Sequence, residues 1–152
     1  MKKILFICLG NICRSCTAQF VFKDMAVKKG VAEHYEVDSA ALSSEESGNP
    51  IYPEALHTLE AHGIVGARHH SRQITAADYE YYDMLVVMDH QNLRSIQRRF
   101  SQDGGSKISL LLDHAPNADH RDIADPWYTR DFETAFRDIS IGCKGLLSEL
   151  EK

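Results

Sequence analysis

Residues 4–15 read I-L-F-I-C-L-G-N-I-C-R-S, and this stretch decides the fold. The apolar run at residues 4–7 is typical of a buried strand, and apolar residues recur at helical spacing after residue 15, up to a plausible stop at Gly30. The stretch therefore predicts a turn from a strand into a helix. In α/β proteins such turns bind phosphate, because free backbone amides and the positive end of the helix dipole face the anion.

The spacing of Cys8 and Arg14 indicates what chemistry this turn performs. Five residues between them are enough for the chain to surround a tetrahedral anion. Cys8 supplies a nucleophile in a field that favours the thiolate, and Arg14 supplies a cation that can grip two oxygens. Gly10 and Asn11 tolerate the left-handed backbone that such a loop needs. The predicted chemistry is attack of sulfur on a phosphate ester.

Strand-like and helix-like segments alternate along the rest of the chain. Strands are predicted at residues 35–40, 83–88 and 108–112, and helices at 53–62, 91–100 and 132–150, with a loop at 43–50 and a turn at 103–105. Alternation of this kind predicts a mostly parallel sheet with helices on both faces, in one domain spanning residues 1–152. Ligands of such folds bind beyond the carboxyl ends of the strands, where Cys8 lies.

Composition narrows the class of protein. The chain has 152 residues, 43% of them apolar, so it can bury a core of its own, and we expect a monomer. A net charge of -5 argues against nucleic acid or an anionic membrane as the main partner. No segment is long enough to cross a bilayer. Four cysteines without an export signal favour a reducing compartment, and we expect the cytoplasm.

Asp125 is the candidate acid. A poor leaving group such as a phenolate must be protonated as it departs, so an acid is needed in addition to the octet at residues 8–15. Asp125 begins the sequence D-P-W-Y, in which proline stiffens the loop and two aromatic residues follow. A lone Asp-Pro is usually only a turn, but the two aromatic residues and the upstream octet favour a catalytic role.

Five motifs together resemble a known family. They are C-L-G-N-I-C-R-S at 8–15, D-S-A-A at 38–41, H-H-S-R-Q-I at 69–74, M-D at 88–89 and D-P-W-Y at 125–128. In this order they closely resemble the low-molecular-weight protein tyrosine phosphatases, over essentially the whole chain. The resemblance implies a four-stranded parallel sheet flanked by helices, catalysis without metal or cofactor, and a cysteinyl-phosphate intermediate. Phosphotyrosine-containing proteins would be the substrates and inorganic phosphate a product.

The same resemblance assigns roles to residues. Cys8 would be the nucleophile, Arg14 would bind phosphate and stabilise the transition state, and Asp125 would serve as general acid and then base. The phosphate loop would comprise Leu9, Gly10, Asn11, Ile12, Cys13 and Ser15. Asn11, Ser15, Ser39 and His69 would support this loop, with Ser15 bonded to the Cys8 thiolate. Ile12, Glu45, Trp127 and Tyr128 would wall the substrate pocket.

The chain departs from the family pattern at several positions. Cys16 replaces a frequent proline and Gln19 an acidic residue; both are expected to lie outside the loop, with little effect on chemistry. Glu45 stands where an aromatic residue is common, which would remove one wall of the ring slot and repel acidic peptides. Trp127 replaces a tyrosine and retains an aromatic wall that can stack on a phenyl ring. Thr129 replaces a glycine.

Alternatives remain open at this point. Phosphoarginine phosphatases of the same family carry threonine where this chain has Ile12, whose apolar side chain suits a phosphotyrosine ring. Arsenate reductases of this fold need further cysteines in mid-chain, and none occurs between Cys16 and Cys143. A non-catalytic phosphotyrosine-binding module would not need all three reactive residues. An iron-sulfur protein is the most distant alternative, because Cys8, Cys13, Cys16 and Cys143 imitate cluster spacing.

Other reactive residues receive lesser roles. Cys13 is a candidate redox partner that could capture an oxidised Cys8 as a disulfide, as occurs in related enzymes. Cys143 lies on the apolar stripe of the last helix and is expected to pack in the core. No metal-ligand spacing links the remaining histidines, which are expected on solvated faces: His57, His62, His70, His90, His114 and His120. Arg94, Arg98 and Arg99 are expected to form an exposed helix face.

Overall fold

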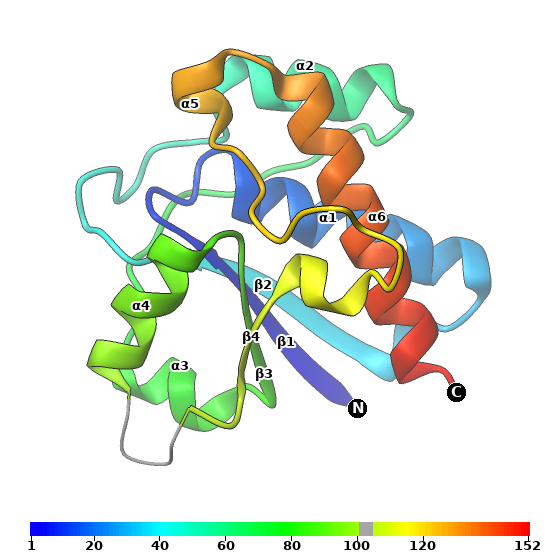
Figure 1. Cartoon of the computed structure of the whole chain (residues 1–152). Helices are drawn as coiled ribbons and strands as arrows, with labels where there is room; N and C mark the ends of the chain where they lie inside the picture. Colours follow the sequence, from blue (N-terminus) through cyan, green and yellow to red (C-terminus); the bar gives the residue numbers. More distant parts are fainter. Residues whose placement is uncertain (101–104) are drawn as a thin grey trace.

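The computed structural model describes residues 1–100 and 105–152 and shows the predicted α/β architecture, with helices on both faces of a four-stranded, all-parallel sheet (Figure 1). The strands are β1 (Lys2–Cys8), β2 (Tyr35–Ala41), β3 (Met84–Val87) and β4 (Ile108–Leu110), in the spatial order β2-β1-β3-β4. The helices are α1 (Arg14–Lys29), α2 (Pro53–Ala61), α3 (Ala76–Tyr81), α4 (His90–Arg99), α5 (Pro126–Thr129) and α6 (Phe132–Leu150). Short 3-10 turns form η1 (Ala32–His34) and η2 (Leu111–His114).

β1 lies in the interior of the sheet, between β2 and β3. Ile4 is opposite Val37 on β2 and Met84 on β3, and both pairings are parallel. Because neighbouring strands flank β1 and helices cover both of its faces, the side chains of residues 4–7 are fully buried. Burial on both faces explains why this strand is a continuous apolar run rather than an alternating one.

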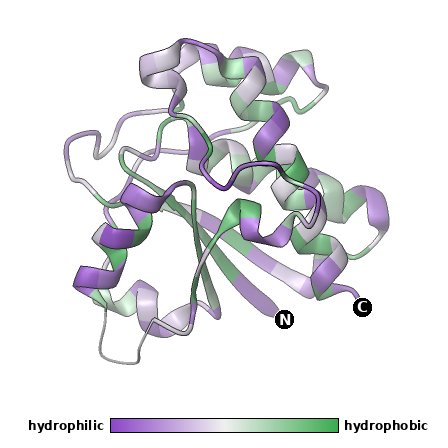
Figure 2. Ribbon diagram, in the orientation of Figure 1, coloured by the Kyte–Doolittle hydropathy of each residue, from purple (hydrophilic) through white to green (hydrophobic). Residues whose placement is uncertain are grey.

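Two apolar clusters lie on opposite faces of the sheet. Ile4 and Phe6 belong to the larger cluster, together with residues of α1, α2 and α6. Leu5 and Ile7 belong to the smaller cluster, with Ile96 of α4 and other residues of that face. Figure 2 shows hydrophobic residues along the strands and hydrophilic ones on outward surfaces such as that of α4. This packing holds the carboxyl ends of β1 and β3 at one edge of the sheet, where the candidate site lies.

The fourth strand is shorter than predicted. We expected a strand at residues 108–112, but β4 ends at Leu110 and the chain turns into η2. Two glycines of α6 make this turn possible: a Cβ on Gly142 would lie 2.5 Å from Leu111 Cγ, and one on Gly145 would lie 2.0 Å from the His114 carbonyl oxygen. η2 therefore packs directly on the α6 backbone. The prediction failed because this contact joins residues distant in sequence.

Other predicted elements agree to within a residue or two, and some were missed. The helix α3 was not predicted, although Thr75 and Asp78 form a capping box at its start, which is a recognisable sequence signal. Asp103 and Gly104 of the predicted turn lie outside the described residues. His114 is not on a solvated face: its side chain is 10% exposed and contacts Ser109 and Glu149.

Candidate active site

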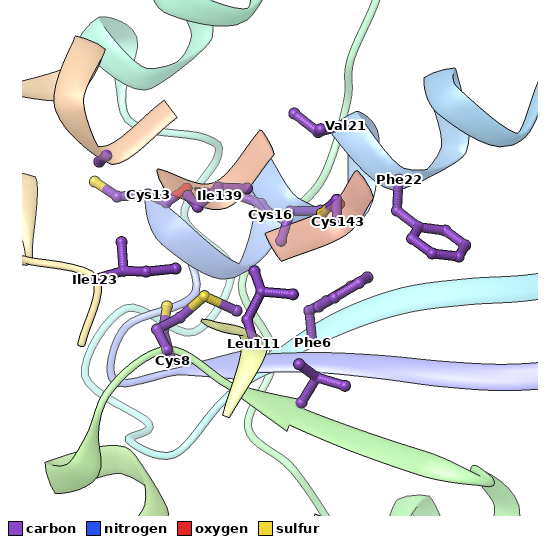
Figure 3. Close-up of a cluster of buried hydrophobic side chains, with 14 of the residues drawn as sticks. Phe6, Cys8, Cys13, Cys16, Val21, Phe22, Leu111, Ile123, Ile139 and Cys143 are labelled. Atoms are coloured by element: carbon purple, nitrogen blue, oxygen red, sulfur yellow. Dashed lines mark hydrogen bonds between the residues drawn. The ribbon is translucent and has the colours of Figure 1, made fainter. Parts of the chain in front are cut away.

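Cys8 ends β1, and the loop that follows it leads directly into α1. Its side chain belongs to the larger apolar cluster, where Figure 3 shows it near the carboxyl end of the strand. The residue is 4% exposed, so only a small part of it is accessible. The chain after β2 holds the start of the loop, because the amides of Leu42 and Ser43 donate to the carbonyls of Cys8 and Leu9, each at 3.0 Å.

Asn11 supplies the backbone reversal of the loop. Its φ is 60°, in the left-handed region that asparagine tolerates better than most residues. Gly10 could tolerate the same conformation but does not adopt it, because it is not among the residues with positive φ. The backbone amide of Asn11 lies 3.3 Å from Cys8 Sγ, so the reversal aims an N–H group at the sulfur.

The Asn11 side chain connects the loop to three neighbouring segments. Its Nδ2 donates to Ser15 Oγ at 2.7 Å and to Ser39 Oγ at 3.0 Å. Its Oδ1 lies 2.7 Å from His69 Nε2, which donates to it. The four residues expected to support the loop therefore form one contiguous network, and Asn11, Ser15 and Ser39 are buried.

The donor directions in this network orient Ser15 toward the sulfur. Ser15 Oγ accepts from Asn11, so its own hydrogen is free to point elsewhere. Cys8 Sγ lies 3.0 Å away, within hydrogen-bond distance of a hydroxyl and a sulfur. A Cys8 thiolate would thus accept from both the Ser15 hydroxyl and the Asn11 amide.

Gln19 lies on α1 outside the loop, as expected, but its side chain belongs to the network that supports the loop. Ser39 Oγ donates to Gln19 Oε1 at 2.6 Å, and Gln19 is 5% exposed. Gln19 follows Ser15 by four residues on α1, so both side chains lie on one face of the helix. That spacing is a signal that sequence reasoning could have used.

A charged layer surrounds His69 on its outer side. Arg72 bridges Asp38 at 3.2 Å and Asp78 at 2.9 Å, and His69 Nδ1 lies 3.8 Å from Asp38 Oδ1. Burial lowers the pKa of His69 below its usual 6.5, with Asp38 opposing this shift and Arg72 adding to it. His69 is therefore neutral at pH 7, which matches its role as an Nε2–H donor to Asn11.

Arg14 is held by groups from two other segments of the chain. Its Nη1 donates to Asp89 Oδ2 and to the Ile123 carbonyl, both at 2.7 Å, and its Nη2 lies 3.5 Å from Asp125 Oδ2. The side chain is 3% exposed. Nearby carboxylates and the Cys8 sulfur raise the pKa of this guanidinium despite its burial. Arg14 is thus a fixed cation beside Cys8.

Sequence reasoning gave no role to Asp89 or to the Ile123 carbonyl. Asp89 was quoted in a motif, and it lies two residues after the end of the buried strand β3. A carboxylate at the carboxyl end of a central strand of a parallel sheet is a usable signal, because such ends meet at the ligand site. The carbonyl of Ile123 has no side-chain signal, so the sequence could not have indicated it.

Asp125, the candidate acid, begins a segment at residues 125–130 that we call the acid loop. Its Oδ1 accepts from the Trp127 amide at 3.0 Å and thereby caps the short helix α5. Its Oδ2 faces Arg14, and the side chain is 24% exposed. Asp125 therefore has one oxygen fixed by the backbone and one turned toward the guanidinium.

One cavity of about 160 Å³ joins the predicted residues. Cys8, Arg14 and Asp125 all line it, together with the loop residues Leu9, Gly10, Asn11, Ile12 and Cys13. The cavity is also lined by Trp127, Tyr128 and Glu45, which were expected to wall a substrate pocket, and by Ser43 and Glu46, which were not expected there. Ser15, Ser39 and His69 are not among the lining residues and stand behind the loop. An anion in this cavity would lie between a thiol, a guanidinium and a carboxyl group.

The other cysteines are buried in the larger cluster. Figure 3 shows Cys13, which immediately precedes α1, Cys16 on the first turn of α1 and Cys143 on α6. Burial and the nearby Cys8 raise the pKa of Cys13 to about 12, so its thiol is neutral at pH 7. Cys143 Sγ contacts the Ala18 carbonyl at 3.7 Å, in agreement with a packing role. The redox role of Cys13 stays a prediction.

The part of the chain that the structure describes contains neither a group of metal-ligating side chains nor a membrane-spanning helix. No three His, Cys, Asp or Glu side chains there are grouped so that they could hold a metal ion. The four cysteines thus form no cluster-binding set. No helix in the same residues is long and apolar enough to span a bilayer.

Comparison with known sequences identifies relatives over the full length. The sequence model of the family described as low molecular weight phosphotyrosine protein phosphatase matches residues 3–152. The low molecular weight protein-tyrosine-phosphatase YfkJ of Bacillus subtilis is 36% identical over 152 residues, which are 100% of this chain and 97% of YfkJ. The human low molecular weight phosphotyrosine protein phosphatase is 38% identical over 97% of this chain and 95% of its own.

Solved structures show the same fold. The crystal structure of YfkJ matches with a TM-score of 0.95 at 35% identity, over 99% of this chain and 95% of that chain. A Drosophila arginine phosphatase matches with a TM-score of 0.88 at 28% identity, over 100% of this chain and 99% of that chain. The fold alone therefore accommodates more than one phosphorylated substrate.

Proposed function

Because the chain belongs to the low molecular weight phosphotyrosine protein phosphatase family, we propose that it hydrolyses phosphotyrosine in proteins through a cysteinyl-phosphate intermediate. One observation carries the proposal: Cys8, Arg14 and Asp125 line a single cavity of about 160 Å³. A nucleophile, a fixed cation and a proton donor around one anion-sized space are the three groups that this reaction needs.

In the first step the Cys8 thiolate attacks phosphorus and the bond to the tyrosine oxygen breaks. The Ser15 hydroxyl, 3.0 Å from the sulfur, and the Asn11 amide, 3.3 Å away, stabilise the thiolate before attack. The Ser15 and Asn11 contacts need no rearrangement, because the buried network behind the loop already fixes both groups. This preorganisation lowers the cost of reaching the transition state.

Arg14 binds the phosphoryl oxygens in both steps. Asp89 and the Ile123 carbonyl hold its Nη1, so its Nη2 is the end turned toward Asp125 and the cavity. An incoming phosphate accepts hydrogen bonds from Nη2 and replaces the long 3.5 Å contact between Nη2 and Asp125 Oδ2. A guanidinium that is held from behind stabilises negative charge on the transferring group without first having to be ordered.

Asp125 transfers the protons. It donates one to the departing phenolate oxygen, and in the second step it takes one from the water that attacks the cysteinyl phosphate. The products are tyrosine, inorganic phosphate and the regenerated Cys8 thiolate. The backbone contact of Oδ1 leaves Oδ2 for this transfer, and Trp127 beside it offers a face for the tyrosine ring.

The apolar side chain of Ile12 favours a phosphotyrosine ring over phosphoarginine. Ile12 lines the cavity, and phosphoarginine phosphatases of the same family carry a threonine hydroxyl at the matching position. A guanidino group would leave its N–H donors unpaired against an isoleucine, whereas a phenyl ring gains apolar contact. Trp127 and Tyr128 extend the apolar surface at the mouth.

Side-by-side turnover of one peptide carrying phosphotyrosine, phosphoserine or phosphoarginine tests the proposal. Only the phosphotyrosine peptide is expected to react fast. Equal or faster release of phosphate from the phosphoarginine peptide would reassign the substrate. Thioredoxin-dependent reduction of arsenate without phosphatase activity would reassign the reaction itself.

A further inference from the structure

The acid loop ends at a residue whose backbone conformation favours glycine. Arg130 has a φ of 61°, and its amide donates to the Pro126 carbonyl at 2.9 Å, which closes α5. Glycine adopts this left-handed conformation without steric cost, whereas an arginine side chain opposes it. The position therefore suggests that the arginine side chain itself serves a purpose.

The Arg130 side chain makes a set of contacts across the rim of the cavity. Its Nη2 donates to Glu54 Oε2 at 2.6 Å and to the Tyr52 hydroxyl at 2.9 Å. Its Cζ lies 5.3 Å from the centroid of the Tyr52 ring and 5.4 Å from that of Phe132, within range of cation–π attraction. One guanidinium thus joins the end of the acid loop to the start of α2 and of α6.

Tyr52 connects this cluster to both loops of the site. Its backbone amide donates to the Ile12 carbonyl at 2.9 Å, which ties it to the phosphate loop. Its ring meets the Trp127 ring edge-on with centroids 4.9 Å apart and stacks on Phe132 at 5.9 Å. Trp127 lies two residues after Asp125, and its amide donates to Asp125 Oδ1. The contact between the Tyr52 and Trp127 rings therefore holds the acid loop close to Asp125.

Few other contacts hold the acid loop. Pro126 is the buried residue of α5, while Trp127 is 43% and Tyr128 76% exposed. The Asp125 contact with Arg14 is 3.5 Å long and must yield to the substrate. A loop with so little buried surface keeps its position through specific side-chain contacts rather than through core packing.

We propose that Arg130, with Tyr52 and Glu54, is a positioning clamp that fixes the acid loop so that Asp125 reaches the leaving-group oxygen. The inference rests on the proposed function, since it presupposes that Asp125 is the acid. Arg130 does not touch the reacting atoms. Its effect is on the distance and direction of proton donation, to which catalysis is sensitive at the scale of about 1 Å.

Substitution of Arg130 by glycine removes the side chain and keeps the backbone conformation. Aryl phosphates with leaving groups from acidic nitrophenol to weakly acidic phenol serve as substrates, and kcat/KM is measured for each. Arg130→Gly is expected to lower kcat/KM about tenfold for the weakly acidic phenol and to leave the nitrophenyl ester nearly unchanged, a partial version of losing the acid. Tyr52→Phe is expected to lower kcat/KM for the weakly acidic phenol by a smaller factor. The double variant should lose no more activity than Arg130→Gly alone.

Controls separate a positioning role from a general loss of structure. Arg98→Ala removes an exposed arginine on α4 and should retain the wild-type profile, while Tm is measured for every variant. If Arg130→Gly lowers kcat/KM equally for all leaving groups, or keeps the wild-type profile, the clamp is refuted. The proposed function is not affected by either result. If Asp125→Asn keeps the wild-type dependence of kcat/KM on the leaving group, Asp125 is not the acid, and both the proposed acid and the clamp are refuted.

Discussion

The phosphate loop and the acid loop face each other across one cavity, and they are held in opposite ways. The phosphate loop is largely buried, and a continuous network from Gln19 through Ser39 and Asn11 to His69 supports it from behind. The acid loop is largely exposed, and side-chain contacts of Arg130 at the rim of the cavity hold it. Under the proposed function, the difference suggests that the nucleophile Cys8 and the cation Arg14 need a fixed frame, whereas the acid Asp125 lies on a segment that must admit and release substrate.

Replacement of the proposed acid should have the largest effect on activity while leaving stability almost unchanged. Asp125→Asn is expected to reduce kcat/KM about 10²–10⁴-fold on aryl phosphates with poor leaving groups, because the proton donor is gone. The unfolding free energy should change by no more than about 0.5 kcal/mol, since asparagine caps α5 equally well. Steady-state kinetics and urea denaturation measure the two effects, and undiminished hydrolysis would exclude Asp125 as the acid.

Loss of the central network residue should affect both properties together. Asn11→Ala leaves buried partners at Ser15, Ser39 and His69 unsatisfied and places alanine in the left-handed region, at a cost of about 3 kcal/mol in unfolding free energy. Activity should fall equally for good and poor leaving groups. Asn49→Ala, which removes an exposed asparagine paired with Glu46, is the matched control. Wild-type stability in Asn11→Ala would contradict the role of the network.

This contrast also explains which parts of the molecule the sequence predicts. The strand, the octet and the acid could be identified locally, because their chemistry lies in short motifs. Gln19 and Asp89 carry sequence signals, a helical spacing and a place after a buried strand, that were not used. The Ile123 carbonyl and the partners of Arg130 could not be identified, since their roles depend on which loops meet above the sheet. η2 was missed for the same reason, because its place depends on two glycines in α6.

Acid should weaken the phosphate-loop network. The folded protein lowers the pKa of His69 below its usual 6.5, so the unfolded chain binds the proton more readily. Stability is therefore complete above about pH 6.5 and declines as pH falls through the folded pKa. Burial is the largest cause of this lowered pKa; the charge of Asp38 opposes it, and those of Arg72, His70 and Lys23 add to it. Urea denaturation between pH 5 and pH 8 measures how the unfolding free energy depends on pH. His69→Gln keeps a donor for Asn11 but does not titrate, so it should reduce this pH dependence.

His120, upstream of the acid loop, should show a smaller effect of opposite sign. Hydrogen bonds to Asp138 at 2.9 Å and to Asp119 raise its pKa above 6.5. The stabilisation is then fully present below pH 6.5 and is lost as pH rises through the folded value. The side chain is 46% exposed, so solvent weakens the effect. Comparison of His120→Asn with the wild type over the same pH range checks the sign, and a gain in stability with rising pH would refute it.

Capture of the intermediate tests the central claim most directly. Asp125→Asn should still be phosphorylated by an aryl phosphate with an acidic leaving group, but it lacks the base that activates water, so the phosphoenzyme should accumulate. After rapid quenching and peptide mapping by mass spectrometry, we expect the phosphoryl group on the peptide that contains Cys8, and no label when Cys8→Ser is added. Turnover with the phosphoryl group on another residue, or undiminished hydrolysis by Cys8→Ser, would contradict the account.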